Sequence, residues 1–339
     1  MIWQFIDSSS VGGAERHIAT LADGLRRHHE PCEIILLARH GQNPWLAQLN
    51  DAGLPFRHLD GTWRGLRQAL GAERPKLLHT HGYKAGILGR LAARLAGLPV
   101  VSTYHSGARG AFPVGAYEWL DDWTSGLGAR IAVSDTIARR LPFKSTVIPS
   151  YVNTPAVPST ELLPMVAGFV GRLSAEKAPD LFCALAAQAQ ASGAAALSWE
   201  IWGDGPMRGE LEAAYGTTVK FHGIATRMED VWPRIGLLVM PSHFEGVPLA
   251  ALEAVAHGIP ILASRVGGLP TVIDDARTGW LFPVGDLAAA GRGLAAWHDA
   301  SAHTCATLRH ACWDKARREF SEERWLPEVL AVYAETTAT

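Results

Sequence analysis

The chain has 339 residues, a length that points to two domains of ordinary size. Hydrophobic residues make up 48% of the sequence and charged residues 19%, which is a globular composition with enough apolar material for two cores. The formal net charge of -2 gives no electrostatic reason for binding nucleic acid, so we expect no nucleic-acid partner.

The cysteines and the N-terminal residues indicate in which cellular compartment the protein is expected. Four cysteines are scattered along the chain and none forms a Cys-x-x-Cys pair, so the sequence predicts neither a disulfide framework nor a zinc site. The N-terminal segment has no basic stretch and reaches Asp7 at once, which argues against a secretory signal. The longest uncharged run, residues 181–199, is interrupted by Gln, Ser and Gly and is not expected to span a membrane. A reduced, cytoplasmic location fits these features.

The first elements form a strand, a glycine loop and a helix. Residues 2–6 predict a strand, and residues 14–26 have helical periodicity. The loop between them ends in Gly12 and Gly13. This arrangement can offer backbone N–H groups to an anion or a sugar. Many glycine pairs only permit tight packing, so the pattern does not decide between the two roles.

Histidines mark the ends of two later strands. Further strands of the first half are predicted at residues 33–38, 54–59, 77–81, 100–105, 130–134 and 147–153, with a helix at 86–96. His79 and His81 are two residues apart and point to one side of their strand. No cysteine or carboxylate lies near them at metal-site spacing, so we predict no metal site. His105 ends its strand, where a histidine is either structural or part of a site.

A proline-rich linker follows the first half of the chain. Prolines at positions 149, 155, 158 and 164 stiffen it. We therefore place one domain at residues 1–155 and a second at residues 164–315.

Two cations open the second half. Arg172 and Lys177 lie between a predicted strand at residues 167–171 and a predicted helix at residues 180–191. Two cations at this position can converge on one diphosphate. Isolated pairs of this kind are also commonly solvated surface charges, and both interpretations stay open at this point.

The most informative segment begins with a short apolar run at residues 237–240, which predicts a buried strand. Pro248 is expected to pre-set the first turn of a helix. Gly258 closes this helix and Pro260 prevents its restart.

Two glutamates flank the start of this helix. Glu245 falls in the loop at the carboxyl end of the strand, where ligands of open parallel sheets bind. The N–H groups of Gly246 and Val247 suit a phosphate there, and the carboxylates can accept hydrogen bonds from sugar hydroxyls. Glu253 lies in an apolar stretch of the helix, so its carboxylate needs a partner. The plainer alternative is a strand, turn and helix with two solvated glutamates.

The remaining segments exclude two kinds of nucleotide site. Strands are predicted around residues 199–206, 219–224 and 260–264, turns at 266–270 and 279–286, and helices from residue 287 to the end. The glycines at positions 203, 205 and 209 do not fit the Gly-x-Gly-x-x-Gly fingerprint of dinucleotide binding. Asp-x-Asp occurs nowhere in the chain, so a metal clamp on a diphosphate is not indicated.

Two motifs resemble a known enzyme family. Phe-Glu-Gly-Val-Pro-Leu-Ala-Ala-Leu-Glu at positions 244–253 resembles the donor-site signature of the retaining glycosyltransferase family 4, also called glycosyl transferases group 1, which has the GT-B fold. Gly-Arg-Leu at positions 171–173, followed by Lys177, resembles a second motif of that family. The resemblance covers nearly the whole chain and is strongest at residues 167–286.

This resemblance implies an α/β architecture. Two Rossmann-like parallel-sheet domains are expected to face a central cleft, the first binding the acceptor and the second the nucleotide-sugar. A last helix, residues 316–339, is expected to cross back to the first domain.

The resemblance also implies roles for individual residues. Catalytic roles fall to His105, Arg172, Lys177 and Glu245. Donor binding falls to Gly12, Gly13, Arg172, Lys177, Gly246, Val247 and Glu253. Acceptor binding is assigned to Tyr83, Lys84, Ser106 and Arg109. Glu245 is not expected to be a covalent nucleophile, and no metal or other cofactor is expected.

The function expected from these roles is transfer of a sugar, with retention of configuration, from a UDP- or GDP-sugar to a glycan or lipid-linked hydroxyl. Cell-envelope polysaccharide or lipopolysaccharide synthesis is the expected setting. The alternatives are a sugar-nucleotide epimerase of the same fold and a catalytically dead nucleotide-sugar-binding module. A glycosidase can also use two carboxylates, but it leaves Arg172 and Lys177 without a role.

Basic and aromatic residues cluster in the first domain, and their meaning is left open. They are Trp63, Arg64, Arg67, Arg90, Arg94, Arg109, Phe112, Trp119 and Trp123. Such residues can rest on the inner face of an anionic membrane or hold a lipid-linked acceptor. They are equally compatible with ordinary helix faces.

Overall fold

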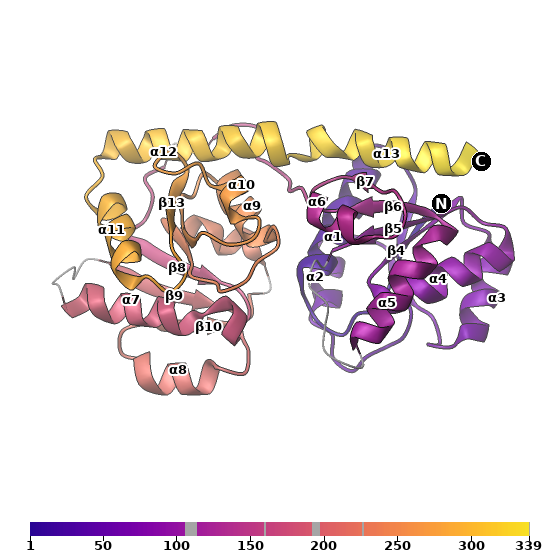
Figure 1. The fold of residues 1–339 in the computed structure, drawn as a ribbon, viewed down its shortest axis with the longest axis horizontal. Helices are drawn as coiled ribbons and strands as arrows, with labels where there is room; N and C mark the ends of the chain where they lie inside the picture. Colours follow the sequence, from indigo (N-terminus) through magenta and orange to yellow (C-terminus); the bar gives the residue numbers. More distant parts are fainter. Residues whose placement is uncertain (106–113, 159–160, 192–196, 226, 339) are drawn as a thin grey trace. The chain divides into compact units, whose positions relative to one another are not determined.

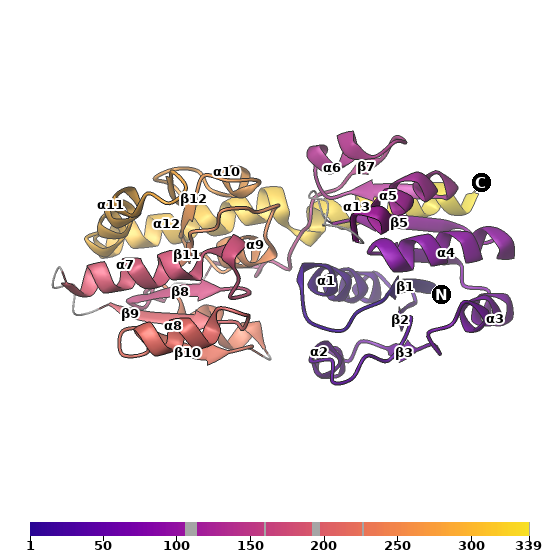
Figure 2. The same ribbon diagram turned by 60° about the horizontal axis from the view of Figure 1, so that its bottom comes forward.

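The computed structural model describes residues 1–105, 114–158, 161–191, 197–225 and 227–338. The chain divides into two compact units. Unit 1 comprises Met1–Tyr151 together with Glu322–Thr339, and unit 2 comprises Val152–Ser321. Each unit is a parallel sheet covered by helices on both faces (Figures 1 and 2).

Unit 1 has a seven-stranded parallel sheet in the order β3-β2-β1-β4-β5-β6-β7. Its strands are β1 (Ile2–Ile6), β2 (Cys32–Leu36), β3 (Phe56–His58), β4 (Leu77–His81), β5 (Val100–Tyr104), β6 (Ala129–Ala132) and β7 (Thr146–Val147). The strand order reverses between β1 and β4, and the carboxyl ends at such a switch point are where ligands of this architecture bind.

The pleat of β1 shows how the two faces of this sheet are filled. Trp3 and Phe5 point to one face, which is covered by α3 and α4, with α5 packed against α4. Ile2 and Ile6 point to the other face, which is covered by α1, α2 and α13. The helices of unit 1 are α1 (Gly13–Arg27), α2 (Trp45–Asp51), α3 (Trp63–Glu73), α4 (Tyr83–Ala96), α5 (Val114–Thr124), α6 (Asp135–Arg140) and α13 (Glu322–Ala338).

Unit 2 has a six-stranded parallel sheet in the order β10-β9-β8-β11-β12-β13. Its strands are β8 (Val166–Val170), β9 (Ser198–Trp202), β10 (Lys220–Gly223), β11 (Leu237–Met240), β12 (Ile261–Ser264) and β13 (Gly279–Phe282). Here the order reverses between β8 and β11, so the loops after these two strands lie side by side at the switch point.

Helices cover both faces of the second sheet as well. One face packs against α7, α8 and α11, and the other against α9, α10 and α12. These helices are α7 (Pro179–Ala191), α8 (Arg208–Tyr215), α9 (Leu249–Ala256), α10 (Leu269–Val272), α11 (Leu287–His298) and α12 (Ala302–Lys315). None of the described helices in either unit has the length and apolar composition that a bilayer crossing requires.

The observed elements differ from the predicted ones in several places: residues 279–282 form β13 where a turn was expected, and α2, α3, α5, α8 and α10 were not predicted. The short helix α2 gives no clear periodic signal in the sequence, because only two of its residues, Trp45 and Leu49, are buried. Helix α4 begins at Tyr83, three residues before the predicted start, directly after Gly82 in a left-handed conformation (φ 78°). Gly82 provides the turn that sends the chain from β4 into this helix.

A buried arginine joins three elements of unit 1. The Arg90 side chain on α4 is fully buried and donates to the Asp121 carboxylate on α5 at 2.6 Å and to the Ser102 hydroxyl on β5 at 2.9 Å. Burial raises the pKa of Asp121, and the adjacent guanidinium partly offsets this effect. Arg90 is therefore a structural residue and not part of the basic surface suggested by the sequence.

Replacing Arg90 with alanine is predicted to lower the free energy of unfolding by about 3–5 kcal/mol, because it leaves the buried Asp121 carboxylate without its cation. Arg94→Ala is the matched control, since Arg94 is exposed on the same helix and its loss should change stability by no more than about 0.5 kcal/mol. Urea unfolding of both variants checks the prediction, and equal losses would contradict it.

Candidate functional site

Three loops meet at the carboxyl edge of the unit 2 sheet. They follow β8, β11 and β12, which are neighbours in the sheet. The N–H groups of His243 and Phe244 donate to the Glu176 carbonyl at 2.9 and 3.3 Å, which joins the loops after β8 and β11. The Gly268 N–H donates to the Gly246 carbonyl at 2.7 Å, which joins the loops after β11 and β12. The site residues predicted for unit 2 lie on or beside these connected loops.

A buried ion pair lies at the centre of this edge. Glu245 is only 5% exposed, and its carboxylate accepts hydrogen bonds from the Lys177 ammonium at 2.6 Å and from the Ser242 hydroxyl at 2.8 Å. The structure thus brings together two residues that were assigned different ligands from the sequence. The Lys177 ammonium has three N–H donors, so contact with Glu245 leaves donors for a further anion.

The second predicted cation has a different environment. Arg172 follows β8 and is exposed, and within the described ranges no hydrogen bond to its side chain is found. Glu176 lies nearby: a hydrogen bond from the Ser174 hydroxyl chiefly lowers its pKa, and the positive charges of Arg172 and Lys177 add to this effect. An exposed cation and a fixed cation therefore border the same loop.

Helix α9 begins one residue later than predicted. Pro248 is not in the first turn, because its ψ of 129° is extended and it occupies the N-cap position before Leu249. Gly246 and Val247 consequently lie in the loop, and among the described residues neither N–H donates to a backbone carbonyl. Glu253 is half-buried in the second turn of α9. The predicted helix end is confirmed, with Gly258 in the left-handed conformation (φ 72°).

Two glycines allow the loop after β12 to approach the Glu245 loop. A Cβ atom on Gly267, whose φ is +53°, would lie 1.8 Å from the Glu245 carbonyl oxygen. A Cβ atom on Gly268 would lie 2.4 Å from a Val247 methyl carbon. Side chains cannot fit at these distances, so the glycines set how closely the two loops pack.

At the carboxyl edge of unit 1, Gly12 caps α1 and Gly13 is its first residue. Asp7 follows β1 and accepts hydrogen bonds from the Lys84 ammonium and the His40 ring, both at 2.6 Å. These two bonds lower the Asp7 pKa, although burial opposes them with the largest single effect. Lys84, a predicted acceptor residue, therefore lies beside the switch point.

The other predicted acceptor residues divide into two groups. Tyr83 is exposed at the start of α4, and its ring stacks on that of Tyr117 with centroids 6.0 Å apart. Ser106 and Arg109 lie outside the described residues.

Histidines form a cluster at the same edge of unit 1. His105 follows β5, and its Nε2 lies 3.1 Å from Nδ1 of His81 at the end of β4. His79 bonds to the Tyr333 hydroxyl at 2.6 Å and to the Thr103 hydroxyl at 2.7 Å. Burial lowers the pKa of all three imidazoles well below the ordinary value, so they are neutral.

Three further members of this cluster were not predicted from the sequence. His17 is buried on α1, one turn before Leu21 on the helix face that points into the core. Gln4 accepts from His81 Nε2 at 2.8 Å and donates to the Tyr333 hydroxyl at 3.1 Å. A signal for Gln4 was present, since it is the single polar residue in the apolar strand β1. Tyr333 carried no such signal, because it reaches this sheet only through the folding of α13.

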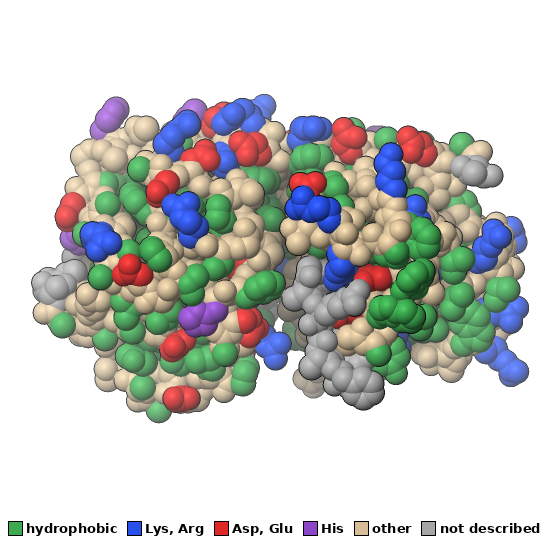
Figure 3. Space-filling model, in the orientation of Figure 1, with side chains coloured by type: hydrophobic (Ala, Val, Ile, Leu, Met, Phe, Trp, Pro, Cys, Tyr) green, Lys and Arg blue, Asp and Glu red, His purple; other side chains and the backbone are tan. Residues whose placement is uncertain are grey.

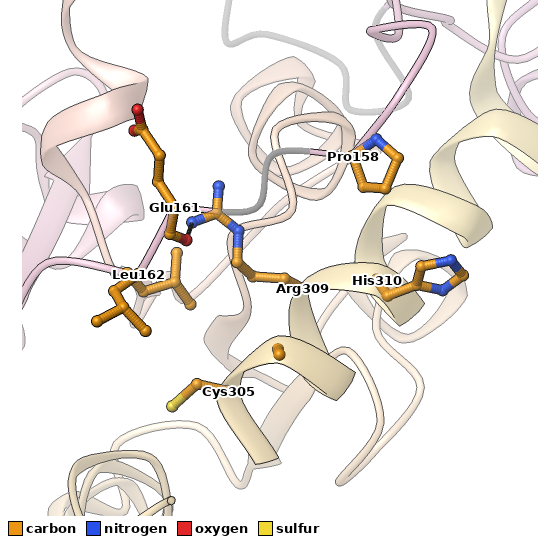
Figure 4. Close-up of a pocket in the computed structure, with 8 residues that line it drawn as sticks. Pro158, Glu161, Leu162, Cys305, Arg309 and His310 are labelled. Atoms are coloured by element: carbon orange, nitrogen blue, oxygen red, sulfur yellow. Dashed lines mark hydrogen bonds between the residues drawn. The ribbon is translucent and has the colours of Figure 1, made fainter. Parts of the chain in front are cut away.

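Figure 4 shows a pocket in unit 2 whose lining includes none of the predicted site residues. It is lined by residues 158 and 161–163 and by α12, and the Arg309 guanidinium donates to the Glu161 carbonyl there. Arg309 also lies against Gly258, in the turn that precedes β12. The pocket therefore lies toward the amino ends of the strands, opposite to the edge that carries the charged loops.

The close approach of the two loops in unit 2 gives a testable prediction. Gly267→Ala should lower the free energy of unfolding by about 1–3 kcal/mol more than Gly285→Ala, because only the first new methyl group collides with a neighbouring backbone. Gly285 is a matched control, since it also has a positive φ (+75°) but no described atom lies within 4 Å of the position that a Cβ would take. Urea unfolding of the two variants measures the difference, and equal stabilities would refute the steric argument.

Two family models match the chain. The model described as "Glycosyltransferase Family 4" matches residues 11–155, and the model described as "Glycosyl transferases group 1" matches residues 164–297. The two matches fall on unit 1 and unit 2 respectively.

Curated relatives carry glycosyltransferase names. The chain is 29% identical over 256 residues to the UDP-Gal:alpha-D-GlcNAc-diphosphoundecaprenol alpha-1,3-galactosyltransferase of Escherichia coli, a match to 66% of each chain. It is 29% identical over 295 residues to the 2-deoxystreptamine N-acetyl-D-glucosaminyltransferase of Streptomyces fradiae, covering 73% of this chain and 65% of the relative. The chain thus spans slightly less than two thirds of the length of these relatives. It is also 28% identical to a D-inositol 3-phosphate glycosyltransferase of Streptomyces scabiei, covering 86% of this chain and 80% of the relative.

Solved structures share the fold at low sequence identity. HepE of Anabaena, solved with UDP and glucose, superposes with a TM-score of 0.82 at 16% identity and covers 98% of this chain and 99% of its own. A TarM variant of S. aureus, solved with UDP and alpha-GlcNAc-glycerol, gives a TM-score of 0.81 at 10% identity with the same coverage. These likenesses agree with the two parallel sheets found here and with the two family matches. The chain therefore belongs to glycosyltransferase family 4, of the glycosyl transferases group 1, and has the GT-B fold.

Proposed function

We propose that the protein transfers a sugar from a nucleotide-diphosphate sugar to a hydroxyl of a glycan or lipid-linked acceptor, with retention of the anomeric configuration and without a metal ion. The observation that carries this proposal is the carboxyl edge of unit 2, where Arg172 and the Lys177–Glu245 pair lie on loops that border the start of α9. A diphosphate and a sugar need this combination of cations, N–H donors and carboxylates.

The cations act on the leaving group. As the bond between the sugar and the phosphate breaks, negative charge grows on the diphosphate. Lys177 and the N-terminal end of α9 stabilise this charge in the positions that they already occupy, and the exposed Arg172 side chain adds a second positive charge. Because the chain has no Asp-x-Asp pair, we assign the charge-stabilising role to these groups and not to a metal.

The carboxylates orient the donor. Glu253 holds the ribose hydroxyls, and Glu245 holds hydroxyls of the transferred sugar while it fixes the Lys177 ammonium at 2.6 Å. Gly246 and Val247 offer N–H groups to the phosphates. The leaving phosphate takes the acceptor proton on the same face, which accounts for retention without a covalent intermediate on Glu245.

Unit 1 provides residues that contact the donor sugar and residues that bind the acceptor. The neutral imidazole of His105 contacts the donor sugar near the reacting carbon, and Gly12 and Gly13 border the same region. Tyr83 and Lys84 bind the acceptor from the start of α4, together with Ser106 and Arg109.

The names of the relatives support a particular donor and acceptor. The Escherichia coli relative is named for a UDP-galactose donor and a diphosphoundecaprenol-linked acceptor, and HepE was solved with UDP and glucose. We therefore propose a UDP-sugar as the first donor to test, and a lipid-linked glycan of a cell-envelope polysaccharide or lipopolysaccharide as the acceptor.

An exposed apolar patch on α4 and α5 supports a peripheral membrane contact, which is part of the proposal. Figure 3 shows hydrophobic side chains gathered over these two helices. The patch comprises Tyr83, Leu91, Leu95, Tyr117, Trp119, Leu120 and Trp123, all at least 36% exposed. Arg64, Arg67 and Arg94 are exposed on α3 and α4 and can attract an anionic membrane on the cytoplasmic side.

Arg172→Ala is predicted to lower turnover by about 100- to 1,000-fold, because it removes one of the two positive charges proposed to stabilise the leaving diphosphate. Because Arg172 is exposed, its loss should leave the fold intact, and the melting temperature of the variant checks this. The assay measures release of free nucleoside diphosphate in the presence of acceptor, which a non-hydrolysing sugar-nucleotide epimerase does not produce.

Lys177→Ala should cause a comparable loss of turnover and also a lower melting temperature, because Glu245 loses its cation. Lys144→Ala removes an exposed lysine of unit 1 and should leave both quantities unchanged. Full turnover in Arg172→Ala and Lys177→Ala would contradict the proposed mechanism.

The membrane contact has its own test. The double variant Trp119→Ser and Trp123→Ser should bind vesicles that contain phosphatidylglycerol at least about tenfold more weakly than the unaltered chain, since burial of one large apolar side chain contributes about 1.5–3 kcal/mol. Leu162→Ser removes a side chain that is 77% exposed in unit 2 and should not change vesicle binding. Equal vesicle binding by the double variant and the unaltered chain, or none by either, would reject this contact.

A further inference from the structure

Three histidines from three separate elements converge inside unit 1. His17 comes from α1, His81 from the end of β4 and His105 from the residue after β5. One ring nitrogen from each lies within 4.8 Å of the other two. This cluster could not be seen in the sequence, because its members are 24 to 88 residues apart in the chain.

Hydrogen bonds fix the tautomer of His81. The side-chain amide of Gln4 donates to the Tyr333 hydroxyl at 3.1 Å, so its carbonyl oxygen accepts from His81 Nε2 at 2.8 Å. His81 therefore carries its proton on Nε2, and the lone pair on its Nδ1 faces His105 Nε2 at 3.1 Å. Metal-binding histidines are commonly oriented in this way, by a hydrogen bond from the ring nitrogen that does not bind the metal.

His17 is the member of the cluster that hydrogen bonds do not explain. It is 4% exposed, and its Nδ1 has no hydrogen-bond partner among the described residues. Its ring meets the ring of His105 edge-on, with centroids 4.8 Å apart. A buried polar atom without a protein partner calls for a bound water, an ion or another ligand.

We propose that His17, His81 and His105 bind a divalent transition-metal ion of the zinc class. All three donors are imidazoles, which suit Zn²⁺, Co²⁺, Ni²⁺ or Cu²⁺ and do not suit Mg²⁺ or Ca²⁺. Zinc to nitrogen bonds of about 2.0–2.1 Å place tetrahedral ligand atoms about 3.3 Å apart, close to the 3.1 Å between His81 and His105.

The protonation states suit a metal. Burial lowers the pKa of His17 to about 4 and those of His81 and His105 well below the ordinary value, so all three are neutral at pH 7 and do not compete with the ion through bound protons. On metal binding, the proton that His105 shares with His81 moves to Nδ1 of His105, and the ring stays neutral. The fourth position is left to water or another small ligand.

Metal binding would have a consequence for transfer. It occupies the His105 nitrogen and holds the ring away from the donor sugar, so zinc-class ions should inhibit the enzyme. This consequence rests on the proposed role of His105, whereas the metal site itself does not.

The binding test uses the full chain after removal of metals with a chelator and dialysis. Co²⁺ is the spectroscopic probe, because nitrogen-ligated Co²⁺ of low coordination number absorbs visible light strongly. We expect visible bands that Zn²⁺ abolishes, and a rise in melting temperature with Zn²⁺. His17→Phe keeps a ring at this position but removes its nitrogens, and should weaken Zn²⁺ binding at least about tenfold. His303→Gln removes an exposed histidine of unit 2 and should behave like the unaltered chain.

Two results would overturn the metal site. One is the absence of both the Co²⁺ bands and the Zn²⁺-induced rise in melting temperature in the unaltered chain, and the other is Co²⁺ bands that persist unchanged in His17→Phe. X-ray absorption of the zinc-loaded unaltered chain needs no variant, and a shell without three imidazole nitrogens also overturns the site. Inhibition is tested separately: Zn²⁺ should lower transfer by the unaltered chain, with less effect on His17→Phe. If no transfer occurs even without metal, the proposed function fails while the Co²⁺ result still stands.

Discussion

A buried carboxylate organises the carboxyl edge of the second sheet. Glu245 is almost fully removed from water and is compensated by the Lys177 ammonium and the Ser242 hydroxyl. A charge in this position is tolerated only with its partners in place, so it fixes the loop after β11 relative to the loop after β8. The glycine at position 267 then lets the loop after β12 close against the Glu245 backbone. The Lys177 ammonium and the N–H groups of this edge are thereby held in position before any ligand arrives, which is what electrostatic stabilisation of a leaving diphosphate requires.

At the corresponding edge of unit 1, the central side chains are neutral and not charged. Its central side chains are histidines that burial keeps neutral, linked through Gln4 to Tyr333 of α13. The last helix of the chain thus supports a cluster that lies at the carboxyl ends of β4 and β5. The charged edge of unit 2 suits a diphosphate, and the neutral histidine cluster of unit 1 suits sugar hydroxyls or, as we infer, a transition-metal ion.

The sequence predicted most strands of both sheets, because short apolar runs are local signals, although β13 lies where a turn was expected. The strand at residues 237–240 is an example, and the helix end at Gly258 was predicted as well. Contacts between side chains that are distant in the sequence could not be predicted from such local signals. Lys177 and Glu245 are 68 residues apart, and only the strand order β8-β11 places them together. The extended conformation of Pro248 also escaped prediction, because proline is compatible with both the N-cap and the first helical turn. His17 was not singled out from the sequence, because it lies on the buried face of α1 among ordinary core residues and its partners come from distant strands.

We propose that unit 2 carries a preformed site that binds a nucleotide-diphosphate sugar without a metal ion. The most direct test of this proposal is the melting temperature of the chain with UDP-, GDP- and ADP-sugars, measured in the presence of a chelator. We predict that one nucleotide class raises the melting temperature, with about 2.7 kcal/mol of added stability at 100 times its dissociation constant. No rise with any of the three classes, or a rise that occurs only when a divalent metal is supplied, would contradict it.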